Sequence, residues 1–358
     1  MMSSTWGTNI ELSIFGESHG QAIGIVIGNL PAGIKLDMEE INKNMKRRAP
    51  GQNKMSTPRK ETDEVHIMSG VIDDITTGAP LCAMIYNSDQ HSKDYSLLKE
   101  CMRPGHSDYP AYIKYKGFND VRGGGHFSGR LTAPIVFAGS VARQILKQKG
   151  IVIGAHIQSI KDIEDKRFPI DMSEEAMDSL LTHQYPTLDQ DVFCKMQEEI
   201  EKARMNQDSV GGKIECMVLN VPAGLGNPFF DSIESHLSPL LFSIPAVKSV
   251  SFGLGEDITK LYGHQSNDCY YFEDGQVKTH TNHNGGIIGG ISNGMPIVLT
   301  VGIKPTPSIS QTQKTINVKT KENIEFNITG RHDPCIVPRA VVVVESMVAL
   351  GILDMINK

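Results

Sequence analysis

The sequence predicts a fold that mixes α-helices with β-strands and consists of two related halves. Three observations predict it. Short β-branched runs alternate with amphipathic stretches, a long polar segment separates an N-terminal from a C-terminal part, and one strand–turn–helix pattern occurs in both parts. With 358 residues, 39% hydrophobic and 21% charged, the chain has the composition of an ordinary soluble globular protein and is long enough for one large or two modest domains.

The chain contains two kinds of local pattern, one typical of strands and the other typical of helices. The β-branched runs are AIGIVIG at 22–28, EVHIMSGVI at 64–72 and APLCAMIYN at 79–87. Amphipathic spacing predicts helices for MEEINKNMKRR at 38–48 and LTAPIVFAGSVARQILKQKG at 131–150. Near the C-terminus we interpret the apolar run AVVVVESMVAL at 340–350 as a buried strand.

The two related halves are suggested by a repeated pattern around a Pro-Ala-Gly turn. Residues 161–207 are polar and helix-favouring, and the C-terminal part begins after them. The stretch GIVIGNLPAGIKLDMEEINKNM at 24–45 is echoed by KIECMVLNVPAGLGNPFFDSIESHLSPLL at 213–241. We therefore expect a single domain, residues 1–358, with two pseudo-repeated halves. The expected boundary between the halves lies approximately at residue 208 and contains no flexible linker.

Charge, cysteine content and the N-terminus exclude several classes of protein. A formal net charge of -6 argues against general nucleic-acid affinity, so an anionic ligand must meet a local concentration of Arg and Lys. The N-terminus has no basic start or apolar core, and no window reaches the roughly 18 apolar residues of a membrane span. The cysteines include no C-x-x-C pair, which favours a reduced, cytoplasmic protein without structural zinc. They are Cys82, Cys101, Cys194, Cys216, Cys269 and Cys335.

The hexapeptide FGESHG at 15–20 contains the G-x-S-x-G pattern of a nucleophilic serine. Only seventeen residues precede Ser18, which leaves no room for the strands that precede such an elbow in α/β-hydrolases. A second interpretation is a Gly-flanked turn in which Ser18 caps the next element and His19 is a surface residue. In the third, the glycines turn the backbone so that Ser18 and His19 point into a cleft, with His19 as the working group.

Two glycine-dense segments could approach a phosphate or a flat ligand closely. In RPGHSDYPAYIKYKGFNDVRGGGHFSGR at 103–130, His106 lies on a Pro-Gly turn and three glycines precede a helix-like segment. The second is NHNGGIIGGISNG at 282–294, followed by KPTPS at 304–308. Flexible or tight turns explain both segments nearly as well. No G-x-G-x-x-G follows a strand, and GNLPAGIK at 28–35 lacks the Walker lysine, so neither a Rossmann site nor a P-loop is predicted.

Two further segments carry charged residues beside turns. The run KRRAPGQNKMSTPRK at 46–60 places cations around a Pro-Gly turn, which suits either a solvated face or a site for a small polyanion. In GRHDPCIVPRA at 330–340, Arg331, His332 and Asp333 come directly before a proline. Loop residues beside a buried element are well placed for chemistry.

In order and spacing, these segments resemble chorismate synthase from about Gly16 to Glu345. The resemblance rests on FGESHG, RRAPGQ, RPGHSDY, RGGGxxSxR, GGIIGGISNG, KPTPS and RHDPC. It implies an α+β fold, a βαβ-sandwich with mixed or antiparallel sheets and helices. It also implies a cytoplasmic homotetramer that uses reduced FMN to convert 5-enolpyruvylshikimate 3-phosphate to chorismate and phosphate, without net redox change. It leaves open whether NAD(P)H is an indirect reductant and whether a separate flavin reductase is a partner.

The resemblance also implies roles for individual residues. His19 and His106 act in proton transfer, and Asp333 lies near the flavin N5. The implied substrate-binding residues are Ser18, Arg48, Arg59, Arg130 and Arg331. The implied flavin contacts are His126, Phe127, Ser128, Ile244, Pro245, Ala246, Gly289, Lys304, Pro305, Thr306, Pro307, Ser308 and Arg331.

One segment departs from the family pattern. The common form is GGGRSSARET, whereas residues 123–132 read GGGHFSGRLT, so that an arginine, a serine and a glutamate are replaced. The positions that differ include two of the implied flavin contacts, His126 and Phe127. The alternative function is a flavin- or phosphate-binding relative without catalysis, and the presence of His19, His106, Arg48 and Asp333 favours the enzyme.

Overall fold

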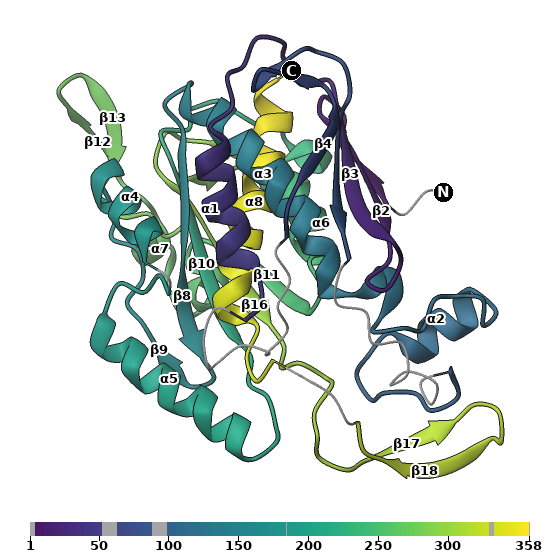
Figure 1. The fold of residues 1–358 in the computed structure, drawn as a ribbon. Coiled ribbons are helices and arrows are strands. Elements are labelled where there is room, and N and C mark those ends of the chain that lie inside the picture. The colour runs from purple at the N-terminus through teal and green to yellow at the C-terminus, as the bar shows by residue number, and fades with distance from the viewer. Residues whose placement is uncertain (1–3, 52–62, 88–98, 184, 329–332, 358) are drawn as a thin grey trace.

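The chain forms two β-sheets on either side of a layer of helices (Figure 1). The structure, a computed structural model, describes residues 4–51, 63–87, 99–183, 185–328 and 333–357. Helix α3 (Thr132–Lys147) packs on the first sheet, and α8 (Val337–Ile356) packs on the second and against α3. The arrangement is a β-α-β sandwich, which confirms the predicted α+β class.

The first sheet is antiparallel and has the strand order β1-β2-β3-β7-β4. Along β3, Ile23, Ile25 and Ile27 are buried on the face toward the helices, as the period of two in a strand requires. The predicted strands at 22–28 and 79–87 are confirmed, and the run at 64–72 divides into β4 and β5. The strands of this sheet are β1 Thr5–Trp6, β2 Glu11–Gly16, β3 Ala22–Gly28, β4 His66–Ser69 and β7 Leu81–Tyr86. Strands β5 Val71–Ile72 and β6 Ile75–Thr76 pair with each other in a separate two-stranded sheet.

The second sheet is also antiparallel and has the order β11-β16-β10-β8-β9. Its strand β8 is buried along its whole length between α8 on one face and α4 on the other. The bounds are β8 Val152–Ile160, β9 Ile163–Glu164, β10 Gly212–Leu219, β11 Val247–Phe252 and β16 Ile297–Ile303, with α4 at Glu174–Thr182.

The helical layer is apolar because two sheets and neighbouring helices cover it. Helix α1 (Met38–Arg48) and α6 (Ile233–Ser243) flank α3 and α8. At the α3–α8 contact, a Cβ on Gly139 would lie 2.2 Å from Ser346 Cβ, so only glycine permits this approach. The predicted helices at 38–48 and 131–150 are confirmed.

The expected strand at 340–350 is wrong, because this run lies within α8. Its valines favour a strand locally, but the helix is buried on all sides. Under full burial an all-apolar sequence cannot show the amphipathic period that distinguishes a helix from a strand.

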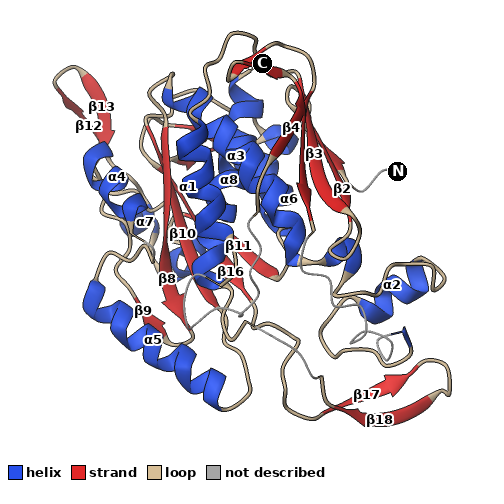
Figure 2. Cartoon of the chain, in the orientation of Figure 1, coloured by secondary structure: helices blue, strands red, loops and turns tan. Residues whose placement is uncertain are grey.

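The remaining elements surround the sandwich, and Figure 2 shows the hairpins β12–β13 and β17–β18 at its periphery. The helices are α2 Asp108–Lys114, α5 Gln190–Met205 and α7 Gly263–Ser266, with short 3-10 turns at Gly125–Phe127, Gly129–Leu131, Phe229–Asp231 and Gly255–Lys260. The hairpin strands are β12 Tyr270–Glu273, β13 Gln276–Thr279, β14 Ile287–Ile288, β15 Ile291–Ser292, β17 Gln313–Asn317 and β18 Glu322–Phe326.

The two Pro-Ala-Gly stretches have the same local order of elements. In one, β3 leads through the turn at 31–33 to α1, and in the other β10 leads through 222–224 to α6. The sheets change between β7 and β8 in the chain, and both β8 and β9 precede residue 208. The division into two related halves near residue 208 stays a prediction.

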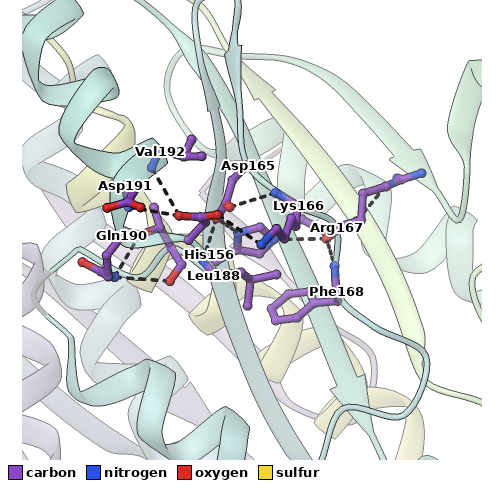
Figure 3. A network of polar contacts seen from close by, with 12 residues as sticks. His156, Asp165, Lys166, Arg167, Phe168, Leu188, Gln190, Asp191 and Val192 are labelled. Atoms are coloured by element: carbon purple, nitrogen blue, oxygen red, sulfur yellow. Dashed lines mark hydrogen bonds and ion pairs between the residues drawn. The ribbon is translucent and has the colours of Figure 1, made fainter.

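A buried polar network ties the second sheet to the loop that follows β9 (Figure 3). His156 on β8 is fully buried; its Nε2 lies 3.1 Å from Glu215 Oε2, and its Nδ1 lies 3.4 Å from Asp165 Oδ2. Glu215 on β10 also accepts from the Phe168 backbone N–H and from Arg167 Nε. Burial lowers the pKa of His156, but the two carboxylates outweigh it, and the net pKa is raised.

Candidate active site

The candidate site surrounds a cavity of about 780 Å³, here called the loop cavity. Its walls come from the loops at 105–107 and 126–132, from residues 242–248 before and within β11, from the segment after β16, and from the start of α8. Five segments that are far apart in the sequence therefore meet at this cavity.

Most of the implied flavin contacts line this cavity. They are His126, Phe127, Ser128, Ile244, Pro245, Ala246, Lys304, Thr306, Pro307 and Ser308. Pro305 lies within the same segment but is not a lining residue. Gly289 is in the turn between β14 and β15, outside the walls of the loop cavity.

His106 also lines the loop cavity and is fixed by a carboxylate that the sequence analysis did not select. Its Nδ1 lies 2.6 Å from Asp108 Oδ1, so the ring donates this proton to Asp108. Asp108 also accepts from Arg103 Nε (2.7 Å) and from the Arg103 backbone N–H (3.0 Å). Burial raises the pKa of Asp108, but hydrogen bonds from Arg103 and His106 outweigh it and hold the pKa far below its usual range. Asp108 is therefore an anion that orients His106.

The three glycines at 123–125 lie against both candidate histidines. All three have positive φ angles, 63°, 137° and 53°. A Cβ on Gly123 would lie 2.3 Å from His19 Cε1, and a Cβ on Gly124 would lie 3.5 Å from His106 Nε2. The glycines therefore serve both the turn and the close approach of the imidazoles.

His19 and Ser18 are both buried beneath this glycine loop, with relative exposures of 3% and 6%. Ser18 Oγ donates to the Arg122 carbonyl oxygen (3.2 Å) and lies 3.0 Å from His19 Nδ1. With its hydroxyl proton directed to Arg122, Oγ can accept a hydrogen bond from the Nδ1–H tautomer of His19. In this tautomer Nε2 is the basic atom of the neutral ring. Ser18 thus positions His19, and this geometry does not make it a nucleophile activated by His19.

Arg48 and Arg130 share one buried carboxylate. Asp63 Oδ2 accepts from Arg48 Nε (2.9 Å), and Asp63 also pairs with Arg130, which lines the loop cavity. The pKa of Arg48 is lowered to about 10. Burial and the positive charges of Arg339 and Arg130 lower it, and together they outweigh the attraction of Asp63. Burial raises the pKa of Asp63, but the two arginines outweigh it and the pKa is lowered. At neutral pH two cations therefore face one anion.

One nitrogen of this pair is available for a further acceptor. Arg48 Nη1 is buried and has no hydrogen-bond partner among the residues that the structure describes. A buried guanidinium nitrogen without an acceptor is costly, and an anionic ligand would satisfy it. The neighbouring Arg47 turns away to the buried Glu345, so the basic run 46–48 does not form a single cluster.

Asp333 lines the loop cavity and accepts from Arg339 Nη1 at 2.9 Å. The expected substrate residues Arg59 and Arg331 lie outside the described residues. His126 is exposed and bridges the first strands to this loop, since its Nδ1 is 2.8 Å from the Gly16 carbonyl oxygen and its Nε2 is 2.8 Å from Ser4 Oγ.

The sequence analysis did not identify four residues of the site: Asp63, Arg103, Asp108 and Arg339. Arg103 and Asp108 lie within RPGHSDY and Arg339 within GRHDPCIVPRA, so a search for charged residues near each candidate histidine or aspartate could have found them. For Asp63 no local signal exists, because only the tertiary structure places it between two arginines.

Two further features of the described residues concern membranes and metal ions. No helix among them is long and apolar enough to cross a membrane. Within the same ranges, no group of three or more His, Cys, Asp or Glu side chains is arranged to hold a metal ion.

Comparisons with known proteins show which family the chain belongs to. The family model described as "Chorismate synthase" matches residues 10–356. A protein named chorismate synthase from Thermococcus gammatolerans is 44% identical over 349 residues, covering 97% of this chain and 96% of the relative. One of the same name from Methanocaldococcus jannaschii is 44% identical, covering 100% and 97%. A solved structure titled "Crystal Structure of Chorismate Synthase" is similar with a TM-score of 0.74 and 28% identity, covering 98% of this chain and 92% of that one.

Proposed function

The chain belongs to the chorismate synthase family, and from this premise we propose that its reaction takes place in the loop cavity with reduced FMN as cofactor. The protein is a carbon–oxygen lyase. It eliminates phosphate from 5-enolpyruvylshikimate 3-phosphate to give chorismate, the last step of the shikimate pathway toward aromatic amino acid precursors. The family and its near relatives favour this function over the non-catalytic alternative.

The loop cavity supports FMN binding by its size and by the chemistry of its walls. Its volume of about 780 Å³ is in the usual range of about 300–1,000 Å³ for small-molecule sites. Phe127, Ile244 and Ala246 offer apolar surface for a flat ring, whereas Lys304 and Ser308 offer a charge and a hydroxyl for a phosphate. When bound, reduced flavin supplies transient electron donation that eases the loss of phosphate, with no net redox change.

The arginines support binding of a substrate that carries two carboxylates and a phosphate. Arg48 and Arg130 pair with Asp63, and Arg339, which lines the loop cavity together with Arg130, pairs with Asp333. Two carboxylates thus balance only part of the charge of three arginines. Their excess positive charge would bind the substrate and stabilise the departing phosphate. The Arg48 Nη1 group without a described partner is the single observation that best carries this assignment.

The histidines support proton transfer on two sides of the glycine loop. His19 carries its proton on Nδ1 toward Ser18 and would accept or donate a proton at Nε2. His106 is held by Asp108 at Nδ1, and its Nε2 lies next to Gly124. One histidine can protonate the leaving phosphate while the other maintains the protonation state of the site; of the two, His106 lines the loop cavity.

Three further properties concern the quaternary structure, the reductant and the cellular compartment. We infer a homotetramer, which the strongly exposed aromatic side chains Phe118, Phe229, Phe230 and Phe272 support as interface candidates. We also propose a separate flavin reductase, with NAD(P)H as the indirect reductant, as the source of reduced FMN. The six cysteines are all free thiols, which supports a reducing cytoplasm.

An anaerobic assay of chorismate formation tests the function and the cofactor together. We expect turnover with FMN reduced by dithionite and none with oxidised FMN alone. Equal activity without any flavin would refute the cofactor assignment. Absence of turnover with reduced FMN, combined with measurable binding of FMN and substrate, would instead support the non-catalytic relative.

A further inference from the structure

A second cavity, here called the helix cavity, has no part in the proposed elimination. It has a volume of about 720 Å³ and lies among α1, α3, α4, the start of β8 and the start of α8. Ile151, Ile153 and Leu181 contribute apolar surface. The helix cavity shares one described lining residue, Arg339, with the loop cavity. Its size suits a small organic ligand.

The walls of the helix cavity are strongly cationic, although the protein as a whole has a net charge of -6. Two carboxylates, Glu40 and Asp178, are among the described lining residues. The cations are Lys43, Lys46, Arg47, Arg143, Lys147 and Arg339. Such a local excess of positive charge raises the concentration of anions at the cavity.

A buried carboxylate behind the wall of the helix cavity pairs with two arginines, so positive charge exceeds negative charge there. Glu345 on α8 is fully buried and accepts from Arg47 Nη1 (2.7 Å) and Nη2 (2.8 Å), and from Arg143 Nη1 (3.0 Å). The side chains of Arg47 and Arg143 are only 15% and 12% exposed. Two largely buried cations on one anion leave a positive charge that burial makes costly, and an anion in the cavity would balance it.

A second, independent observation at this cavity is a donor without an acceptor. The Tyr185 hydroxyl is buried and has no hydrogen-bond partner among the described groups, although Tyr185 lines the cavity. Burial raises the pKa of Tyr185, so the phenol stays protonated and can donate. Cys335 adds no negative charge to the wall, because burial raises the pKa of its thiol to about 12.

We propose that the helix cavity is a second ligand site, which binds a small organic anion bearing carboxylate or phosphate groups and communicates with the loop cavity through Arg339. Arg47 and Arg143 supply buried cations, Lys46 and Lys147 supply exposed ones, and Tyr185 supplies a neutral donor. The apolar part of the wall favours an organic anion over a bare inorganic ion.

The communication follows from the position of Arg339. This side chain lines both cavities and donates to Asp333 at the loop cavity. An anion in the helix cavity competes with Asp333 for the guanidinium group, because both are acceptors for the same donors. Occupancy of the helix cavity therefore changes the charge that Asp333 experiences.

Calorimetric titration of the full chain tests the site at pH 7 and constant ionic strength. Citrate serves as the carboxylate probe and glycerol 3-phosphate as the phosphate probe, and the arm that binds identifies the favoured group. We expect the double variant Lys46→Gln/Lys147→Gln to weaken binding at least tenfold. The matched control Lys149→Gln/Lys195→Gln removes two exposed lysines outside the cavity and should change binding less than twofold. Neither double variant alters a buried group.

The same proteins test the communication. The probe that binds should change the rate of chorismate formation in the wild type and in the control, and not in Lys46→Gln/Lys147→Gln. If neither probe binds, or if both double variants bind equally, the site is refuted. Binding that is lost in the cavity variant but leaves the wild-type rate unchanged would refute the role of Arg339.

Discussion

At the residue scale, several side chains of the candidate site are oriented by a hydrogen bond or an ion pair with another residue. Ser18 lies within hydrogen-bond distance of His19 Nδ1, Asp108 holds His106, and Asp63 holds two arginines. In each case a buried or partly buried polar group has a hydrogen-bond partner, since burial without one costs about 1–3 kcal/mol. The reacting groups and their supports should therefore respond differently to substitution.

His19 is expected to be essential and Ser18 to assist it. His19→Ala should lower kcat by roughly 10²- to 10⁴-fold, the contribution of one acid–base group, with substrate binding changed far less. Ser18→Ala keeps the imidazole and should be milder. Steady-state kinetics with reduced FMN measure both. Stoichiometric labelling of Ser18 by a fluorophosphonate, with near-normal turnover in His19→Ala, would restore the serine-hydrolase interpretation.

Asp108 is expected to act as a positioning residue. Asp108→Asn removes the anion that accepts from His106 and Arg103, and a hydrogen bond to a charged group contributes about 1.5–3 kcal/mol. We expect kcat to fall about 10- to 100-fold with KM changed much less. Asp108→Glu, which keeps the charge, should recover part of the rate. A purely structural role would instead show equal losses in both variants, together with a lower melting temperature.

At the element scale, turns rather than strands determine where the candidate histidines lie. The glycine loop at 123–125 packs its backbone against His19 and connects to α3 through two 3-10 turns. The loop also receives the Ser18 backbone N–H at the Gly125 carbonyl oxygen (3.1 Å). The first strands and the start of α3 are thus joined through the candidate site.

Gly123→Ala should impair activity beyond its effect on stability. The added Cβ would lie 2.3 Å from His19 Cε1 and 2.5 Å from its Nδ1, so the imidazole must move. The matched control is Gly150→Ala, which has a similar φ of 77° but no atom within 4 Å of the added Cβ. Both variants should lose about 1 kcal/mol of stability, because alanine tolerates this backbone poorly. Only Gly123→Ala should lose kcat, by tenfold or more, and equal activities would contradict this interpretation.

At the scale of the whole molecule, two sheets enclose the helix layer, and buried charges occur at several contacts between elements. The His156 network joins β8, β10 and the loop after β9 (Figure 3). Asp354 near the end of α8 accepts from the backbone N–H groups of Asn9 and Ile10, which attaches the N-terminal residues to that helix. Such contacts make global stability depend on pH.

The free energy of unfolding should contain a contribution from His156 that weakens as pH rises. The folded pKa is raised above the unfolded value of about 6.5, so the contribution is complete below that pH and is lost as pH rises through the folded pKa. Urea denaturation between pH 5.5 and 9 should show His156→Gln less stable than the wild type at low pH, with the difference shrinking at high pH. The control is His264→Gln, an exposed histidine. A difference independent of pH would show that His156 does not carry its charge in the folded protein.

The sequence by itself determined the family and the mixture of strands and helices, and it named ten of the residues that line the loop cavity as flavin contacts, because these follow from local patterns and ordered motifs. The tertiary structure decided three other matters. It showed that the valine run at 340–350 is a helix, because full burial removes the periodicity that sequence analysis needs. It placed Asp63 between Arg48 and Arg130, and it separated Arg47 from Arg48. These outcomes depend on contacts between residues far apart in the chain, and no local pattern encodes which distant charge a buried side chain will meet.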